Sequence, residues 1–149
     1  MYKILTKQIE ELIEEEPWHI SVFSNVSALL YETMENINWA GFYIVRDGKL
    51  LLGPFQGKPA CIQIGKGRGV CGSAWEKDET IRVPDVHQFP GHITCDSASR
   101  SEIVIPIHKD GEVVAVLDID SPVRERFSET DQAGLEQIVK CIEANVTMT

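Results

Sequence analysis

The chain has 149 residues, and its 14 Lys and Arg against 23 Asp and Glu give a formal net charge of −9. This length predicts one domain with a hydrophobic core. The composition, with 43% hydrophobic and 25% charged residues, excludes a largely disordered chain and fibrous proteins. The acidic balance, without a basic stripe, argues against binding to nucleic acid or to an anionic membrane. No apolar run approaches a membrane span and no signal-peptide hydrophobic region is seen, so the expected location is cytoplasmic.

Hydrophobic periodicity predicts an α+β domain, in which a mainly antiparallel sheet has helices packed on one face. The first helix is amphipathic and Pro17 is a natural stop, while Asp47-Gly48 predicts a hairpin turn. In chain order, the expected elements are helices at 3–15 and 20–34, strands at 38–45, 50–52 and 61–64, a short helix ending near 75–77, strands at 80–83, 102–108 and 112–119, and a last helix after Ser128.

The last helix has the clearest start. Ser128 and Asp131 form Ser-x-x-Asp, a loose variant of the capping box, ahead of an apolar face that includes Leu135 and Ile142. Residues 84–101 read as a long irregular loop, and such loops in compact domains are usually functional. No repeat or linker divides the chain, so one domain is expected over residues 1–149, with an N-terminal helix at 1–16 and a core at 20–146.

Strand alternation places acids and aromatics on one face of the sheet. Asp118 and Asp120 share the face opposite the apolar residues of their strand, and Glu102, Trp39 and Tyr43 occupy the corresponding face of two others. Considered alone, this pattern favours the solvated side of a half-exposed sheet. The alternative is a ligand site, because Asp is depleted in strands and two neighbouring carboxylates beside aromatics would attract a ligand ammonium group.

The four cysteines include no C-x-x-C pair, which argues against a zinc ribbon or a thioredoxin-like motif. A zinc site that combines scattered cysteines with His87 and His92 is a weaker alternative. Cys61, in an apolar strand, and Cys141, at the edge of a helix face, are expected to be structural by default.

The other two cysteines have less ordinary surroundings. At a helix N-terminus, Cys71 would have its thiolate favoured by the helix dipole. Cys95 lies in a small polar loop, an unusual place for a structural thiol, where Asp96 should raise its pKa and Arg100 should lower it.

The glycine-rich loop at 65–72 does not match a nucleotide-binding motif. Val70 replaces the third glycine of G-x-G-x-x-G, and no Gly-Lys-Ser/Thr closes a P-loop. Two interpretations remain: backbone N–H groups that bind a carboxylate, or a flexible connection.

Six segments together resemble the free methionine-(R)-sulfoxide reductases, enzymes built on a single GAF domain, and the resemblance covers about residues 20 to 145. They are Asn38-Trp39-Ala40-Gly41-Phe42-Tyr43, Gly53-Pro54-Phe55-Gln56-Gly57-Lys58, Gly67-Arg68-Gly69-Val70-Cys71-Gly72, Asp85-Val86-His87, Gly91-His92-Ile93-Thr94-Cys95-Asp96 and Leu117-Asp118-Ile119-Asp120-Ser121. Three cysteines together with the Asp-Ile-Asp-Ser strand end are far more specific than a generic GAF pattern.

The resemblance implies a GAF-like fold and reduction of free methionine-(R)-sulfoxide, with thioredoxin as reductant. Nothing in the sequence requires a metal or an organic cofactor. The resemblance also implies a possible homodimer formed through helices, for which 3–15 is the candidate. It implies that Cys95 is the nucleophile that becomes a sulfenic acid, that Cys61 is the resolving thiol, and that Cys71 is a third thiol able to enter a disulfide. The implied carboxylates, which hold the substrate amino group and assist proton transfer, are Glu102, Asp118 and Asp120. The implied aromatic wall consists of Trp39 and Tyr43.

Elementary chemistry agrees with these roles. A thiolate that attacks a sulfoxide sulfur expels oxygen, which leaves well only when protonated, and a carboxyl of raised pKa could supply the proton. The sulfenic acid then condenses with a second thiol. Two other classes use the same features: a non-catalytic GAF module that binds a small ligand, and a thiol-based redox sensor. Against the first, a cyclic nucleotide phosphate should favour cations over a cluster of acids.

Overall fold

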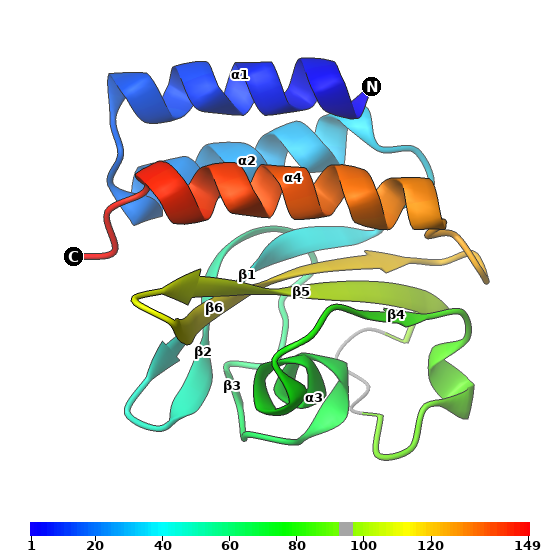
Figure 1. Ribbon diagram of the computed structural model, residues 1–149. Coiled ribbons are helices and arrows are strands. Elements are labelled where there is room, and N and C mark those ends of the chain that lie inside the picture. Colours follow the sequence, from blue (N-terminus) through cyan, green and yellow to red (C-terminus); the bar gives the residue numbers. More distant parts are fainter. Residues whose placement is uncertain (93–96) are drawn as a thin grey trace.

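A six-stranded antiparallel sheet organises the computed structural model, which describes residues 1–92 and 97–149 (Figure 1). The strand order is β3-β2-β1-β6-β5-β4. The elements are α1 (Tyr2–Glu15), α2 (His19–Thr33), β1 (Trp39–Arg46), β2 (Lys49–Gly57), β3 (Gln63–Ile64), α3 (Gly69–Lys77), β4 (Ile81–Val83), the 3-10 turn η1 (Val86–Gln88), β5 (Ser101–Lys109), β6 (Glu112–Ser121) and α4 (Glu129–Asn145).

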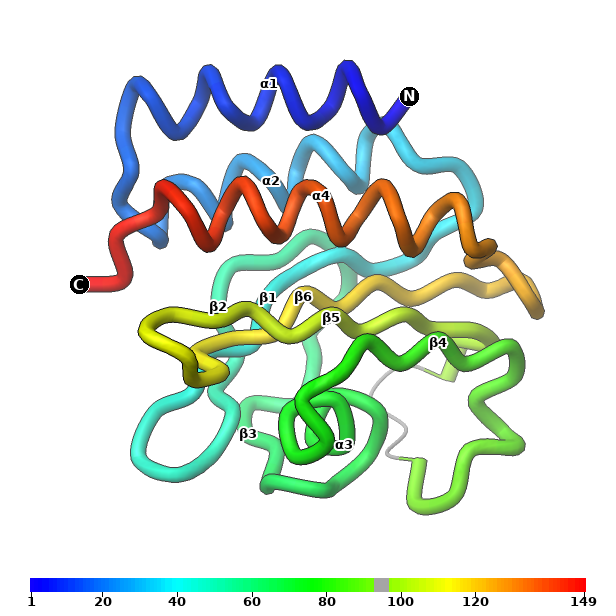
Figure 2. The backbone as a smooth tube through the Cα atoms, viewed as in Figure 1, coloured from blue at the N-terminus to red at the C-terminus, as the bar shows by residue number. Residues whose placement is uncertain are grey.

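Three of the four helices lie on the same side of the sheet. The helices α2 and α4 pack directly on the strands and α1 lies across both, whereas the short helix α3 lies against the opposite face (Figures 1 and 2). The predicted α+β architecture, a mainly antiparallel sheet with helices packed on one face, is therefore confirmed. The addition of α3 on the second face changes the environment of that face.

The core on the side of α2 and α4 is the predicted apolar face of the strands. Ile103, Ile107 and Leu117 are almost completely buried there, and each such side chain contributes roughly 1.5–3 kcal/mol by leaving water. The helices contribute residues at helical spacing, among them Leu5, Ile9, Ile13, Val22, Phe23, Val26, Leu30, Leu135, Ile138, Val139 and Ile142.

The first helix buries one face in this core and leaves the other to solvent. Leu5, Ile9 and Ile13 are buried, but Ile4 is 67% exposed. A homodimer through residues 3–15 stays a prediction.

Within residues 1–92 and 97–149, none of the helices has the length and apolarity needed to cross a membrane.

The strand predicted at 61–64 is shorter than expected. Only Gln63 and Ile64 pair with β2, whose own length of nine residues exceeds the predicted 50–52. The Cys61 carbonyl instead accepts a hydrogen bond from the hydroxyl of Tyr43 at 2.9 Å. The last backbone hydrogen bond on this side joins the Leu52 amide to the Ile62 carbonyl at 2.8 Å, so Cys61 precedes the strand.

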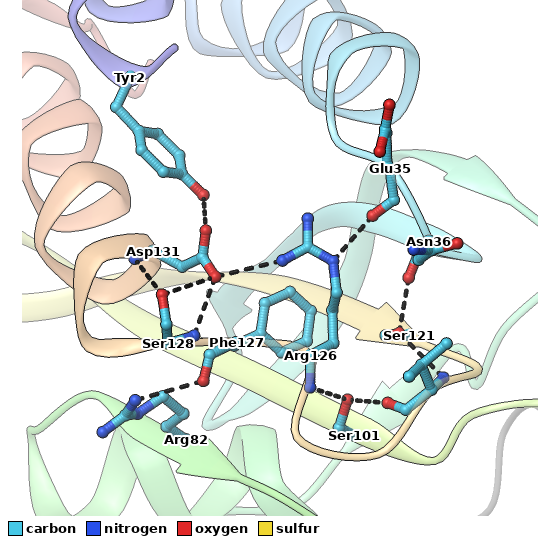
Figure 3. A network of polar contacts seen from close by, with 11 residues as sticks. Tyr2, Glu35, Asn36, Arg82, Ser101, Ser121, Arg126, Phe127, Ser128 and Asp131 are labelled. Carbon is cyan, nitrogen blue, oxygen red and sulfur yellow. Dashed lines mark hydrogen bonds and ion pairs between the residues drawn. The ribbon is translucent and has the colours of Figure 1, made fainter.

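A polar network joins the start of α4 to the start of β5 and the end of β6 (Figure 3). The predicted capping box is present, because the Ser128 hydroxyl accepts from the Asp131 amide at 3.1 Å while the Asp131 carboxylate accepts from the Ser128 amide at 2.9 Å. The same carboxylate accepts a 2.5 Å hydrogen bond from the Tyr2 hydroxyl of α1 and a 3.2 Å bond from Arg126. One buried carboxylate therefore links two helices and the loop after β6.

The network also fixes the residues that flank the strand ends. The Ser101 hydroxyl donates to the carbonyl of Val123 at 2.5 Å and accepts from the amide of Arg126 at 3.3 Å. The Ser121 hydroxyl donates to the carbonyl of Asn36 at 2.6 Å. Because Ser101 precedes Glu102 and Ser121 follows Asp120, these bonds hold the backbone on which two predicted site residues sit.

We expect Asp131→Asn to lower the free energy of unfolding at pH 7 by about 1–2 kcal/mol, because it weakens a helix cap and two further polar contacts. Burial opposes ionisation of Asp131, but hydrogen bonds from Ser128 and Tyr2 and the charge of Arg126 lower its pKa overall. A lowered pKa means that this stabilisation is present above the unfolded pKa of about 3.9 and is lost as the pH falls through the folded pKa.

Urea unfolding from pH 7 down to pH 2.5 measures this effect, with Glu129→Gln, an exposed acid of the same helical turn, as the matched control. The two variants should differ at pH 7 and converge at the acid end. Equal stability of both variants at pH 7 would contradict the role of Asp131.

Candidate active site

The register of β5 and β6 brings three carboxyl groups together. Glu102 of β5 pairs directly with Asp120 of β6, and Asp118 lies two residues along the same face. Glu102 and Asp118 are only 7% and 5% exposed, and Asp120 is half-buried. The three side chains lie within hydrogen-bonding reach of one another. The predicted acidic cluster therefore exists, and it lies inside the protein.

Two aromatic rings from β1 form a wall beside the carboxyls. Trp39 pairs with Asp120 across the strands, and its ring stacks on Tyr43 with centroids 5.9 Å apart. The indole N–H donates to the carbonyl of Lys58 at 3.1 Å, which fixes the ring. Gly41 leaves room for it, since a Cβ there would lie 2.8 Å from the indole and 2.3 Å from Phe55 Cβ. A larger residue at this position would displace the wall.

The third side of the site is α3 with the glycine-rich loop before it. The loop is internally bonded, with the Gly67 amide donating to the Gly72 carbonyl at 2.9 Å and the Gly72 amide to the Arg68 carbonyl at 2.9 Å. A Cβ at Gly72 would lie 2.4 Å from the Gly65 carbonyl oxygen, so only glycine permits this close approach. The interpretation of 65–72 as a flexible connection is therefore wrong: the loop is a packed wall.

A cavity between these three walls collects most of the predicted site residues. Besides carboxyls and aromatics it includes the thiol of Cys71, and its lining residues are Trp39, Tyr43, Pro59, Ala60, Ile64, Arg68, Gly69, Val70, Cys71, His92, Ser99, Glu102, Asp118 and Asp120. Sequence reasoning did not assign Arg68, His92 or Ser99 to this site. Their only signal was position, since Arg68 and His92 lie in segments that carry predicted cysteines, and Ser99 lies between Cys95 and Glu102.

The face that carries these groups is covered, so the expectation of a solvated sheet surface is wrong. Val104 and Val116 of the same face are fully buried and pack with Val70, Ala74 and Trp75 of α3. The amphipathic signal of α3 is weak because nearly all of its first seven residues are buried. The local sequence therefore gave no sign of which sheet face this helix would cover.

Burial dominates the electrostatics of the carboxyls. Removal from water, together with the neighbouring charges of Asp118 and Asp120, holds the pKa of Glu102 well above its usual range. Burial also raises the pKa of Asp118, although hydrogen bonds from its neighbours partly oppose this. Asp118 Oδ1 is buried and has no hydrogen-bond partner among the residues that the structure describes. Such an atom favours a bound donor or cation in the cavity.

The pKa of the Cys71 thiol is raised, contrary to the effect expected of a helix N-terminus. It lies in the first turn of α3, but burial and the negative charges of Asp118, Glu102 and Asp120 raise its pKa well above the usual value. The charge of a helix end is worth at most about 2 kcal/mol. Desolvation and three nearby carboxyls therefore outweigh the dipole.

One group of described side chains could hold a metal ion. The Cys71 sulfur and one carboxyl oxygen each from Glu102 and Asp118 all lie within 4.8 Å of one another. A metal would have to displace the protons whose retention burial favours here. In the described part of the chain, neither His87 nor His92 belongs to such a group, and His87 is exposed.

The cysteines divide into different states. Cys61 is half-buried and disulfide-bonded, so its expected role as an inert strand thiol is wrong. Cys71 and Cys141 are free, and Cys141 packs at the edge of the helix-side core as expected. Cys95 lies outside the described residues, and its predicted role as nucleophile stays a prediction.

We expect Glu102→Gln to make the ligand-free protein more stable than wild type at pH 8. The raised pKa means that the folded state keeps a proton which the unfolded chain releases above about pH 4.3, so wild-type stability falls as the pH rises from there through the folded pKa. Gln has nearly the same shape and never ionises.

Urea unfolding at pH 4 and pH 8 tests this expectation, with Glu112→Gln at the exposed start of β6 as the matched control. The stability difference between Glu102→Gln and wild type should grow with pH, while the control should follow wild type. A pH-independent difference would contradict the buried, proton-retaining state of Glu102.

Comparisons with known proteins place this site in a family. A GAF domain profile matches residues 23–144. The free methionine-R-sulfoxide reductase of Escherichia coli is 47% identical over 148 residues, covering 99% of this chain and 90% of that protein.

Solved structures agree with the sequence matches. The reduced fRMsr of Staphylococcus aureus is 51% identical with a TM-score of 0.95, covering 98% of this chain and 95% of that one. The free methionine-R-sulfoxide reductase of Neisseria meningitidis, solved with its substrate, is 42% identical with a TM-score of 0.93, covering 97% and 87%. The chain therefore belongs to the free methionine-R-sulfoxide reductase family of GAF domain proteins.

Proposed function

We propose that this protein is an oxidoreductase that reduces free L-methionine-(R)-sulfoxide to L-methionine, acting as a single GAF domain. The observation that carries the proposal is one cavity that combines three carboxyls, two aromatic rings and a thiol. The names of the Escherichia coli and Neisseria meningitidis relatives support the same activity, and two solved relatives are described as complexes with substrate.

The carboxyls explain why the substrate is a free amino acid. Its ammonium group supplies a positive charge beside Glu102, Asp118 and Asp120. The same group donates a hydrogen bond to the unpaired Oδ1 of Asp118. Trp39 and Tyr43 add cation–π attraction and surround the apolar end of the substrate. A peptide-bound methionine sulfoxide lacks the ammonium group, so it would leave buried carboxylates unpaired and be rejected.

In the proposed reaction the Cys95 thiolate attacks the sulfoxide sulfur, and the substrate leaves as a thioether while Cys95 becomes a sulfenic acid. The carboxyl of Glu102 donates the proton that the sulfoxide oxygen needs, a task suited to an acid of raised pKa. The sulfenic acid then condenses with a second thiol, releasing water and forming a disulfide. Thioredoxin, the proposed reductant, returns both thiols with two electrons and two protons.

The state of the other cysteines supports Cys61 over Cys71 as the resolving thiol. Cys61 is disulfide-bonded, and it is only half-buried. An exchanging sulfur must be accessible to a reductant, and this partial exposure meets that need. Cys71 is free and buried, and its raised pKa disfavours the thiolate, so it is a poor nucleophile at neutral pH. Its position against Asp118 suits a role in shaping the pocket.

The first experiment measures consumption of free L-methionine-(R)-sulfoxide and, separately, of the (S) epimer, with thioredoxin, its reductase and NADPH as the electron source. We expect turnover of the R epimer alone, abolished by Cys95→Ser and unchanged by Cys141→Ser, which replaces a free thiol far along the chain on α4. Full activity of Cys95→Ser would overturn the mechanism. Consumption of neither epimer by folded, reduced protein would favour a ligand-binding module or a redox sensor.

A second variant tests the ammonium site. Asp118→Asn should raise KM for the sulfoxide at least as much as it lowers kcat, because the lost charge mainly weakens binding. A loss of about tenfold or more in kcat/KM is expected for a buried charge contact. Asp110→Asn, the same substitution in the exposed turn between β5 and β6, is the control. A change in kcat alone would place Asp118 in proton transfer and not in binding.

A further inference from the structure

We propose that the surface around Cys61 is the docking site for the reducing partner, and that this partner is a small dithiol protein with an apolar patch beside its attacking thiol and an acidic rim. The surface consists of Ile62 with the side chains of Lys58, Lys66 and Arg68, and we call it the Cys61 surface. The inference rests on the proposed function, because it concerns the step that regenerates the reduced enzyme.

The charge distribution along the chain singles out this surface. Residues 48–75 contain Lys49, Lys58, Lys66 and Arg68 and no acid, so all 23 Asp and Glu of a chain with net charge −9 lie elsewhere. Lys58, Lys66 and Arg68 are exposed. Glu76, just beyond this segment, approaches Gly67 and leaves the cations in excess. A partner with acidic groups around its thiol is therefore attracted here and repelled by most of the remaining surface.

Ile62 supplies the apolar anchor. Its side chain is 74% exposed, more than any other large hydrophobic side chain in the described part of the structure. Its backbone is held in place, since its carbonyl accepts from the amide of Leu52 at 2.8 Å and the neighbouring Cys61 carbonyl accepts from Tyr43. A single exposed isoleucine is ordinary, but this one directly follows the disulfide-bonded Cys61, has its carbonyl bonded to β2, and lies in the only acid-free stretch of this length in the sequence, which suits recognition.

The surface also reaches the cavity. Pro59 and Ala60, which connect Lys58 to Cys61, line the pocket together with Arg68. Lys66 lies over the ring of Trp75, 5.1 Å from its centroid, so its charge is held close to the first turns of α3. Arg68 therefore lines the cavity, Lys58 precedes two of its lining residues, and Lys66 lies against α3, the helix on the side of the molecule opposite α1, α2 and α4 (Figure 1).

The chemistry of the step balances as thiol–disulfide exchange. A thiolate of the partner attacks Cys61 Sγ, the enzyme disulfide breaks, and the second sulfur leaves as a thiolate that takes up a proton. The partner's second thiolate then attacks the mixed disulfide, which releases Cys61 as a thiol after protonation. Two electrons and two protons pass from the dithiol to the enzyme, and the partner is left as a disulfide.

The test follows reduction of the purified oxidised protein directly, without sulfoxide, by counting new thiols after addition of reduced thioredoxin or of dithiothreitol. We expect Ile62→Asp and Lys58→Glu to slow reduction by thioredoxin by about tenfold each. Both variants should stay within about twofold of wild type with dithiothreitol, which needs no docking surface. Ile4→Asp and Lys7→Glu on α1 are the matched controls and should change neither rate.

Each outcome is decisive. Wild-type rates of both Cys61-surface variants with thioredoxin would overturn the proposal, as would an equal loss with dithiothreitol, which would indicate a local structural effect. A shift from dimer to monomer in Ile62→Asp, seen by light scattering, would assign the surface to a second copy of the chain and also overturn it. Because no sulfoxide is present, a failure of the proposed enzymatic activity leaves this measurement intact.

Discussion

The gathering of three carboxyl groups in one cavity, two of them on buried residues, is the constraint around which this protein is arranged. The pairing of Glu102 with Asp120 and the position of Asp118 follow from the antiparallel register of β5 and β6, which the hydrophobic residues on the other face fix. Taking such groups out of water is costly unless they keep protons or meet a cation. The fold therefore gathers in one cavity acids that favour either a retained proton or a bound cation.

The remaining structure makes that arrangement persist. Ser101 anchors the start of β5 and Ser121 anchors the end of β6, next to the acids. Asp131 of α4 bonds to Tyr2 of α1 and to Arg126 in the loop after β6. On the opposite side, α3 and the glycine-rich loop close over the carboxyls, and the close contact at Gly72 holds helix and loop together. The stability of the helix-side core thus offsets the cost of keeping the carboxyl groups of this pocket out of water.

Much of the site was predictable because strands impose a strict period of two residues. Once Ile103, Leu117 and Phe42 were assigned to one face, the opposite face had to carry Glu102, Asp118, Asp120, Trp39 and Tyr43. Cys71 illustrates the limit of this reasoning. Its place at a helix start was readable, but its raised pKa depends first on burial and then on acids from strands more than thirty residues away in sequence.

The sequence by itself determined the helices, most strands, the capping box at Ser128 and the family, since these depend on local periodicity and on short motifs. Only the tertiary structure decided that α3 covers the second sheet face, that Cys61 leaves its expected strand, and that Arg68, His92 and Ser99 join the cavity. The physical reason is that burial is a property of how elements pack, and it sets the pKa of each acid and thiol. A local pattern tells which residues share a face, whereas packing decides whether that face meets water.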